Sequence, residues 1–360
     1  MQTDSDPIVR TATLQDAPQI LEVLFAAFER WPLFDLDVSP LAHLMWKLET
    51  ATGDPGPQHL VAIVDGTVAG VLLAWPGEAK AGSRLLASYN PTDIAVAPRY
   101  RGRSISKLLI EASLALDPAT DQLSLDTATN EPALQHVWPL NGPQTPMRVW
   151  SRPLTSIAAL RRSLDRRRWR AIVGAPLRML SRRLDRDRLD AAAVTVIDQF
   201  DHRADDLWSA ASAEFDVIRR RDVATLNWRY LDRRAGRIEV LAIEDQASLI
   251  GFLAARAPDS QGVSKVLDVL ARPGRADAVE ALLSAASRRA RGGGATSIQL
   301  WLPPGHSYEP LLEHGGFFAA PGDVPVEVDT DYLRRTPSIA DLFSVPTTKI
   351  HLTLGDFDWA

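Results

Sequence analysis

The sequence predicts an α/β protein that carries two copies of one structural unit. The chain has 360 residues, a length that suits two domains. An apolar pattern recurs: Trp46 precedes Gly70 by 24 residues, and Trp228 precedes Gly251 by 23. Further along, residues 130–136 are similar to residues 308–314. Matched segments in the same order and at similar spacing indicate an internal duplication.

The first half predicts strands and helices in alternation. Apolar residues at helical spacing indicate a helix over 14–28, with Thr13 as its N-cap and Asp16 three residues further on. Asp65-Gly66 is typical of a two-residue hairpin turn. Further patterns predict strands at 7–11, 60–64, 67–74, 92–97, 123–127 and 147–151, and helices at 104–116 and 131–138.

The second half repeats this order. Its strands are expected at 194–197, 240–254 (a hairpin), 266–271, 297–302 and 347–354, and its helices at 205–215, 275–291 and 308–314. Residues 321–345 contain Pro321, Gly322, Pro325 and Pro337 and are expected to form an irregular insertion.

Composition excludes several classes of protein. The chain has no cysteine, which rules out disulfides, thiolate metal sites and a cysteine nucleophile and fits a cytoplasmic location. No run of 18 apolar residues indicates a membrane-spanning helix, and the first 13 residues do not resemble a secretory signal. The net charge of −5 gives no general attraction to nucleic acid. No cluster of His, Asp and Glu has metal-ligand spacing, so no metal is expected.

Residues 92–109 combine a strand, a turn rich in small and basic residues, and an amphipathic helix. A helix N-terminus leaves backbone N–H groups unpaired and carries partial positive charge. Small residues let an anion approach these groups, and Arg99, Arg101 and Arg103 add positive charge. The pattern suits a pyrophosphate, and it equally fits a strand–turn–helix with a solvated basic turn.

The same residues resemble motif A of the GNAT acetyltransferases, in which Arg/Gln-x-x-Gly-x-Gly/Ala follows a strand and opens a helix. Here the motif is Arg99-x-x-Gly102-x-Ser104. The order of elements resembles that fold from residue 7 to about 151, and the second copy extends the resemblance over most of the chain. The resemblance implies two tandem GNAT folds, each a mixed twisted sheet flanked by helices.

The implied domain organisation has three parts. An N-terminal GNAT domain with the CoA-binding motif covers 1–151, a basic helical linker covers 152–190, and a degenerate C-terminal GNAT domain covers 191–360. Residues 161–190 hold eleven Arg and four Asp with an interrupted apolar stripe. This stripe is expected to pack on a neighbouring domain; docking on an anionic membrane surface is the alternative.

The resemblance implies an acyl-CoA co-substrate, acetyl-CoA or another acyl-CoA. The amides of Arg101, Gly102, Arg103 and Ser104, with Ser106, would bind its pyrophosphate. The main chain of Ile94 and Val96 would pair with pantetheine, and Asn130 would hold the pantetheine arm. An N–H near Val96 would polarise the thioester carbonyl.

Two departures from the family pattern affect catalysis. Ser104 replaces the second glycine of the motif. The tyrosine that often acts as general acid is replaced by Trp138 in the first copy and by Leu312 in the second. The second copy also carries Pro273 and Asp277 at its turn, which predicts that it no longer binds CoA.

Asp93 is the candidate general base, because it begins the central strand and could face the cleft. Glu49 and Glu78 are the alternatives, and for all three a solvated or capping carboxylate is the common case. The expected function is transfer of an acyl group to a small amine, such as an amino sugar or a cell-surface precursor. A catalytically weak acyl-CoA sensor or scaffold is the second hypothesis.

Overall fold

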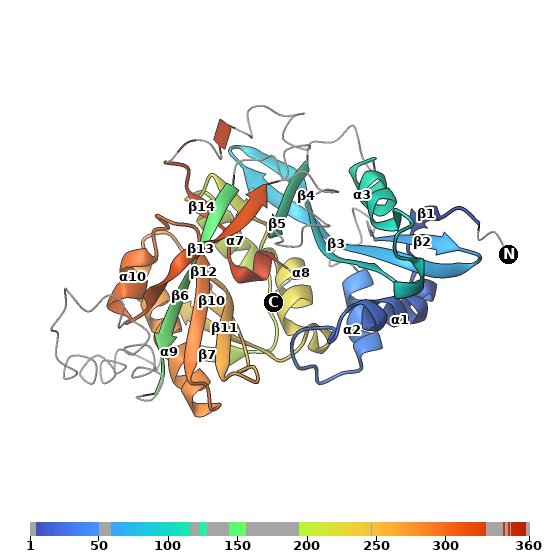
Figure 1. Ribbon diagram of the computed structural model, residues 1–360. Coiled ribbons are helices and arrows are strands. Elements are labelled where there is room, and N and C mark those ends of the chain that lie inside the picture. The colour runs from blue at the N-terminus through green and yellow to red at the C-terminus, as the bar shows by residue number, and fades with distance from the viewer. Residues whose placement is uncertain are drawn as a thin grey trace, which may run out of the picture.

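One continuous twisted sheet runs through the protein (Figure 1). The computed structural model describes residues 5–49, 59–115, 122–127, 144–155, 194–245, 247–328, 341–342, 345 and 347–357. Within them, 14 strands join in one sheet, and its main path runs β1-β2-β3-β4-β5-β13-β6-β12-β11-β10-β9-β7. Strand β8 pairs with β3 and β14 beside this path.

The first half supplies one end of the sheet. Its strands are β1 (Ile8–Thr11), β2 (Leu60–Val64), β3 (Thr67–Ala81), β4 (Arg84–Val96), β5 (Gln122–Thr127) and β6 (Gln144–Pro153). Its helices are α1 (Ala17–Ala27), α2 (Pro40–Leu48) and α3 (Ile105–Ala115), with 3-10 turns η1 (Leu14–Asp16) and η2 (Pro98–Tyr100).

The second half supplies the other end. Its strands are β7 (Val194–Ile197), β8 (Val217–Arg219), β9 (Ile238–Asp245), β10 (Ser248–Arg256), β11 (Val263–Ala271), β12 (Ser297–Leu302), β13 (Phe318–Val328) and β14 (Ile350–His351). Its helical segments are α7 (Arg203–Ser212), α8 (Val223–Leu226), η5 (Asn227–Leu231), η6 (Arg233–Ala235), α9 (Ala276–Gly292), α10 (Glu309–His314) and η7 (Leu354–Asp356).

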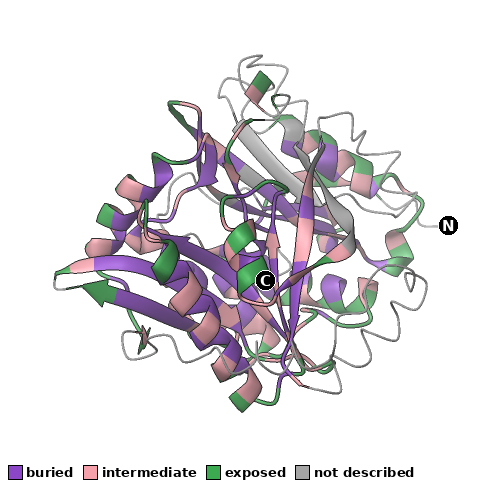
Figure 2. Cartoon of the chain, turned by 90° about the vertical axis from the view of Figure 1, so that its left-hand side faces the viewer, coloured by how far each residue is buried: buried purple, intermediate pink, exposed green. Residues whose placement is uncertain are grey.

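Helices cover both faces of each half because the strands are apolar on both sides. In the first half α1 and α2 lie on one face and α3 on the other, each over its own apolar cluster. In the second half α9 and α7 occupy opposite faces in the same way. Figure 2 shows the strands mostly buried and the outward helix faces exposed. The observed layers agree with the predicted α/β class.

The two halves repeat the same strand register. Gly70 of β3 lies opposite the last residue of β4, and Gly251 of β10 lies opposite the last residue of β11. Asp93 and Asp268 each lie three residues before that position, and both ladders shift register beside them. An insertion at the same place in both halves supports the predicted duplication, since β-bulges are specific features of a fold.

The pairing of β6 and β13 crosses the boundary between the halves. Strand β6, which was expected to close the first unit, pairs with β12 and β13. Strand β13 comes late in the chain and pairs with β5 of the first half. The sequence pattern locates a strand but not its partner, because partners are chosen by long-range packing. The domain bounds 1–151, 152–190 and 191–360 stay predictions.

Three expectations about individual segments are corrected. Residues 321–328 belong to β13, and a register shift between Ala319 and Asp323 takes up Pro321 and Gly322; proline is tolerated in a sheet at such bulges. The strand expected at 347–354 is reduced to β14, followed by η7. The hairpin of β3 and β4 is also longer than the patterns at 67–74 and 92–97 indicated.

Candidate functional site

Strand β4 has an open edge in its C-terminal part. It pairs with the parallel strand β5 over 87–89, and within the described residues no strand lies on that side from 90 to 96. On the other side, the Ala97 N–H donates to the Ala69 carbonyl at 2.9 Å. Hydrogen-bonded and non-bonded residues alternate in an antiparallel ladder. The main-chain groups of Ile94 and Val96 therefore point to the open edge, as the sequence-based assignment requires.

The turn after β4 exposes backbone N–H groups. Gly102 has φ 79° and Ser104 φ 57°, so both adopt left-handed conformations before α3 begins. In the described part of the chain, the N–H groups of Gly102, Ser104, Ile105 and Ser106 have no acceptor. A Cβ built on Gly102 would meet no atom within 4 Å. The turn thus presents donors to open space at a helix N-terminus, which is an anion-binding arrangement.

Helix α3 is held close to the sheet at this turn. The side chains of Ile105 and Leu109 are buried on β2 and β3. A Cβ built on Gly70 would lie 2.7 Å from Cγ2 of Ile105 and 3.2 Å from the Ala95 carbonyl. The absence of a side chain at residue 70 therefore fixes how near the first turn of α3 approaches β3 and β4.

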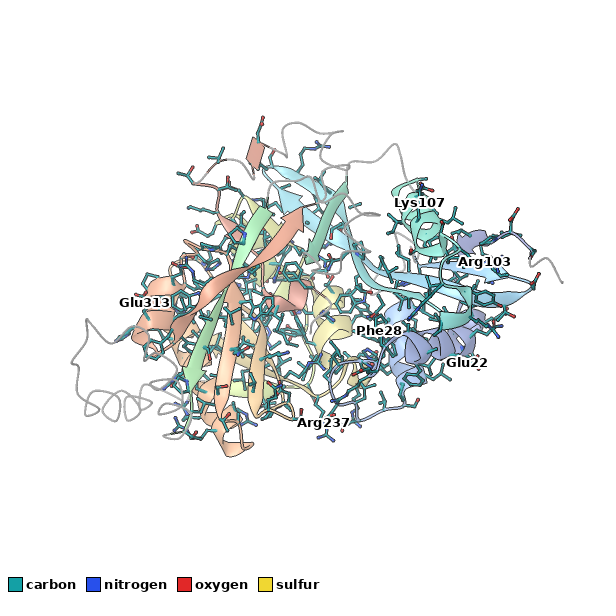
Figure 3. The ribbon with its side chains drawn as sticks, in the orientation of Figure 1. Glu22, Phe28, Arg103, Lys107, Arg237 and Glu313 are labelled. Atoms are coloured by element: carbon teal, nitrogen blue, oxygen red, sulfur yellow. The ribbon has the colours of Figure 1, made fainter. Side chains whose placement is uncertain are left out.

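The three arginines of the turn have different roles. Arg99 and Arg101 are exposed, and the guanidinium of Arg99 lies 4.8 Å from the centre of the Tyr100 ring. Arg103 donates to the Ser5 carbonyl at 2.9 Å, and it lies beside the start of α3 in Figure 3. Their charges surround the turn, which raises the local positive potential for an anion.

Asp93 is buried, and both of its carboxylate oxygens are engaged. The ammonium of Lys47, on α2, lies 2.5 Å from Oδ2, and the indole N–H of Trp31 donates to Oδ1 at 3.1 Å. Lys47 and Asp93 are 3% and 11% exposed in their side chains, so this is a buried ion pair at the β4 bulge. The assignment of Asp93 as the general base stays a prediction.

The alternative bases form ion pairs with arginines of the second half. Glu49 lies 2.8 Å from Arg234, and Glu78 pairs with Arg220. Both pairs are partly exposed. These ion pairs connect the two halves of the chain, which is a structural role. The sequence alone does not distinguish a carboxylate in such a pair from a catalytic base.

An aromatic cluster fills the junction between the halves. The two repeat-matched residues, Trp46 and Trp228, stack with ring centres 5.1 Å apart, and Trp75 contacts both. The guanidinium of Arg229 lies 3.5 Å from the centre of the Trp75 ring, and the Lys47 ammonium lies 5.7 Å from it. The internal repeat matches Trp46 with Trp228, and the structure brings the two side chains into contact. Nothing local in the sequence marks Trp75, Lys47 and Arg229 as their neighbours.

Two buried histidines next to this cluster are neutral at physiological pH. Burial, together with the nearby Lys47 charge, lowers the pKa of His43 to about 3. The same two causes, burial first, lower the pKa of His59 to about 3. Nδ1 of His59 accepts from the Ala74 N–H at 3.2 Å, so this histidine helps to hold β3.

In the second half, the position that matches Asp93 is Asp268, and its partners are other side chains of the same half. Asp268 accepts from Arg221 at 2.8 Å and from the Tyr230 hydroxyl at 3.0 Å. Turn η7 packs beside it, and a Cβ on Gly355 would lie 2.8 Å from the Leu267 carbonyl. At the following turn, Asp277 pairs with Arg275 at 2.8 Å in the first turn of α9. A carboxylate there competes with any bound anion.

Several sequence-based predictions fall on residues outside the described ranges. These are the roles of Asn130 and Trp138 and of the basic stretch 161–190. Leu312 is fully buried in the second core. Among the described residues, no group of three or more His, Asp or Glu could hold a metal ion, and no helix is long and apolar enough to cross a membrane.

Comparison with known proteins agrees with this architecture. Residues 19–139 match the model of the acetyltransferase (GNAT) family. No curated protein matches the chain by sequence. An N-myristoyltransferase from Saccharomyces cerevisiae with bound myristoyl-CoA is similar over 90% of this chain and 83% of its own, with 12% identity and a TM-score of 0.58.

Two bacterial structures show the same likeness. A GCN5-related N-acetyltransferase from Kribbella flavida covers 91% of this chain and 70% of its own, with 17% identity and a TM-score of 0.54. A second GCN5-related N-acetyltransferase, from Anabaena variabilis, covers 89% of this chain and 72% of its own, with 13% identity and a TM-score of 0.57. At these identities the likeness establishes the fold, and the predicted fold class is confirmed.

Proposed function

Residues 19–139 match the model of the acetyltransferase (GNAT) family, and from this premise we propose that the chain is a CoA-dependent N-acyltransferase. It would transfer an acyl group from acetyl-CoA or another acyl-CoA to a small amine. The observation that carries the proposal is the row of free N–H groups at Gly102, Ser104, Ile105 and Ser106, next to the open edge of β4.

The turn suits the diphosphate of CoA. Phosphate oxygens are strong acceptors, and four unpaired N–H donors at a helix N-terminus complement them. The open space beside Gly102 allows a close approach, and the exposed side chain of Arg101 supplies a cation. The left-handed conformation of Ser104 is sterically unfavourable for a residue with a Cβ. Such strain is found at functional turns that aim their donors.

The open edge of β4 suits the pantetheine arm. This arm contains amide groups, and the main chain of Ile94 and Val96 offers donors and acceptors as a neighbouring strand would. The arm would then carry the thioester toward the β4 bulge at Asp93. An N–H at this edge would stabilise negative charge on the thioester oxygen. The amine nitrogen attacks the thioester carbon, and the C–N bond forms as the C–S bond breaks. CoA leaves as its thiolate, which takes up a proton from water, and the proton lost by the amine passes to a base or water.

One acyl-CoA per chain is expected. In the second half, Asp277 occupies the first turn of α9, and η7 packs against the β11 bulge. The similar fold of the N-myristoyltransferase, which was solved with myristoyl-CoA, supports an acyl-CoA as the co-substrate.

The test of the donor site is the substitution Gly102→Glu, followed by isothermal titration with acetyl-CoA. The carboxylate would repel the diphosphate and occupy its space, so binding should disappear. Gly274→Glu is the matched control, because Gly274 has φ 75°, lies in the second-half turn and also has open space around it. Unchanged affinity in Gly102→Glu, or equal loss in both variants, would remove the assignment.

The sensor hypothesis is favoured by one observation. Both oxygens of Asp93 are engaged, so the first candidate base is already bound to Lys47 and Trp31. Thiol release from acetyl-CoA, measured over a panel of amines, separates the two hypotheses. Tight binding of acetyl-CoA without turnover on any amine would favour the sensor.

A further inference from the structure

The turn between β4 and α3 carries an excess of positive charge. The segment 94–110 has no acidic residue, and its basic residues are Arg99, Arg101, Arg103 and Lys107. Arg103 donates to a main-chain carbonyl at 2.9 Å, and Lys107 pairs with a carboxylate one helical turn away at 3.6 Å; both lie beside the start of α3 in Figure 3. Arg99 and Arg101 are exposed, and neither forms a hydrogen bond or an ion pair within the described residues.

The Tyr100 ring restricts the position of the Arg99 guanidinium. The ring centre and the guanidinium carbon are 4.8 Å apart, which is a cation–π contact. Tyr100 is half-buried and packs against the apolar clusters on both faces of the sheet. Its N–H donates to the Ala97 carbonyl at 2.8 Å, which connects η2 to the end of β4. The ring contact takes up no hydrogen-bond acceptor, so the donors of Arg99 stay available to an anion.

The unpaired N–H groups of the turn are sufficient for the diphosphate of CoA. The groups at Gly102, Ser104, Ile105 and Ser106 are as many donors as a diphosphate has non-bridging oxygens. Arg101 is adjacent to Gly102 and adds a cation to this row. Arg99 lies further back, in η2, and therefore flanks the row.

CoA carries a second anionic group, the 3′-phosphate of its ribose. This group is a phosphate monoester, which has about −1.5 to −2 charges at pH 7 and strong acceptor oxygens. Guanidinium groups bind phosphate oxygens with paired N–H donors and are weakly hydrated compared with ammonium groups. An exposed arginine without an acidic partner, beside the diphosphate site, therefore suits this phosphate.

We propose that Arg99 binds the 3′-phosphate of CoA, and that Tyr100 is the residue that positions Arg99. The inference rests on the proposed function, since that function places the diphosphate on the adjacent N–H groups. Arg101 then serves the diphosphate and Arg99 the ribose phosphate. The chain selects a donor that carries the 3′-phosphate over one that lacks it.

The test is isothermal titration with CoA and with 3′-dephospho-CoA, which differ in this phosphate alone. The wild-type protein should bind CoA about tenfold or more tighter, because a charge-assisted hydrogen bond is lost with the phosphate. Arg99→Gln should weaken CoA binding about tenfold and leave the affinity for 3′-dephospho-CoA unchanged, so the preference disappears. Because Arg99 is exposed and unpaired in the described chain, this substitution should not affect folding.

Arg101→Gln is the matched control, because it removes the same charge from the same turn. It should weaken the binding of both ligands by an equal factor and keep the preference for CoA. Raising the salt concentration should reduce the preference in the wild-type protein, because exposed charges are screened.

Two substitutions of Tyr100 test its positioning role. Tyr100→Phe keeps the ring and should keep the preference for CoA, whereas Tyr100→Leu removes the ring and should reduce it. The ratio of the two affinities is the readout, since a loss of stability alone would weaken the binding of both ligands equally. If Tyr100→Leu does not fold, Tyr100→Phe and Arg99→Gln still test the assignment.

Three results would overturn the inference. The first is equal affinity of the wild-type protein for CoA and 3′-dephospho-CoA. The second is a parallel loss for both ligands in Arg99→Gln, as in Arg101→Gln, which would assign Arg99 to the diphosphate. The third is a full preference for CoA in Tyr100→Leu, or its loss in Tyr100→Phe, which would end the positioning role. Failure of the wild-type protein to bind either ligand would instead count against the proposed function, so the two failures are distinguishable.

Discussion

Gly70→Ala tests whether the packing of α3 against the sheet sets the positions of the unpaired N–H groups at residues 102–106, which we call the donor turn. A Cβ at residue 70 would lie 2.7 Å from Cγ2 of Ile105 and 3.3 Å from Cδ1 of Leu109. Ile105 is β-branched and is the first residue of α3, so it has little rotamer freedom. The first turn of the helix must then move outward by several tenths of an ångström or more.

The expected cost has two parts. Overpacking of this kind lowers the free energy of unfolding by about 1–3 kcal/mol. The shift also moves the N–H groups of Ser104, Ile105 and Ser106, each of which contributes about 1.5–3 kcal/mol when it donates to a charged phosphate oxygen. Losing the alignment of one of them should weaken acetyl-CoA binding about tenfold or more. Urea unfolding and isothermal titration measure the two effects separately.

Gly251→Ala is the matched control in the second half. A Cβ there would lie 2.8 Å from the Leu270 carbonyl, so stability should fall to a similar extent. In the turn of that half, the Asp277 carboxylate pairs with Arg275 in the first turn of α9, where it would repel a diphosphate, so acetyl-CoA affinity should not change. If Gly70→Ala lowers stability but leaves acetyl-CoA affinity at the wild-type value, the position of α3 does not set the donor geometry and the reasoning is refuted.

Two further experiments test the buried ion pair and a buried neutral histidine at the junction. Lys47→Met leaves Asp93 buried without its cation and should lower the free energy of unfolding by about 3–5 kcal/mol, whereas Lys47→Met with Asp93→Leu should recover most of the loss in urea unfolding; an additive double variant would contradict this. As the pH falls from about 6.5 toward 3, His43 binds a proton in the unfolded chain and stays neutral in the folded chain. The free energy of unfolding should therefore decline by up to about 1.4 kcal/mol per pH unit because of this group. His43→Gln, which can still reach the Arg234 carbonyl, should reduce that slope in urea titrations between pH 7 and 4; an unchanged slope would rule out this histidine as a source.

Local sequence pattern was sufficient to predict the position of most helices and strands. The hairpin at Asp65-Gly66 formed as expected, because Asp65 and Gly66 both adopt positive φ in the turn. The turn between β4 and α3 was also located from sequence, since small and basic residues between an apolar strand and an amphipathic helix mark a helix N-terminus. The main-chain N–H and C=O groups of Ile94 and Val96 point to the open edge of β4, because the direction of these groups alternates from one residue to the next along a strand.

Side-chain partners could not be found in the same way. Lys47 meets Asp93 although 46 residues separate them, and Trp228 meets Trp75 across the two halves. Asp93 looked like a candidate base because an acid at a central strand can face a cleft. The engagement of both its oxygens depends on where α2 and Trp31 pack, and no local signal records that.

The sequence by itself determined the α/β class, the hairpin turn at Asp65-Gly66 and the place of the turn at Gly102 between a strand and a helix. Each of these depends on interactions between residues close in the chain, and hydrophobic period and turn chemistry report such interactions directly. Only the tertiary structure decided that β6 and β13 pair across the halves, that Asp93 is bound to Lys47, and that Trp46, Trp75 and Trp228 pack together. Those contacts are set by how the apolar faces pack together, and that packing is a property of the whole chain.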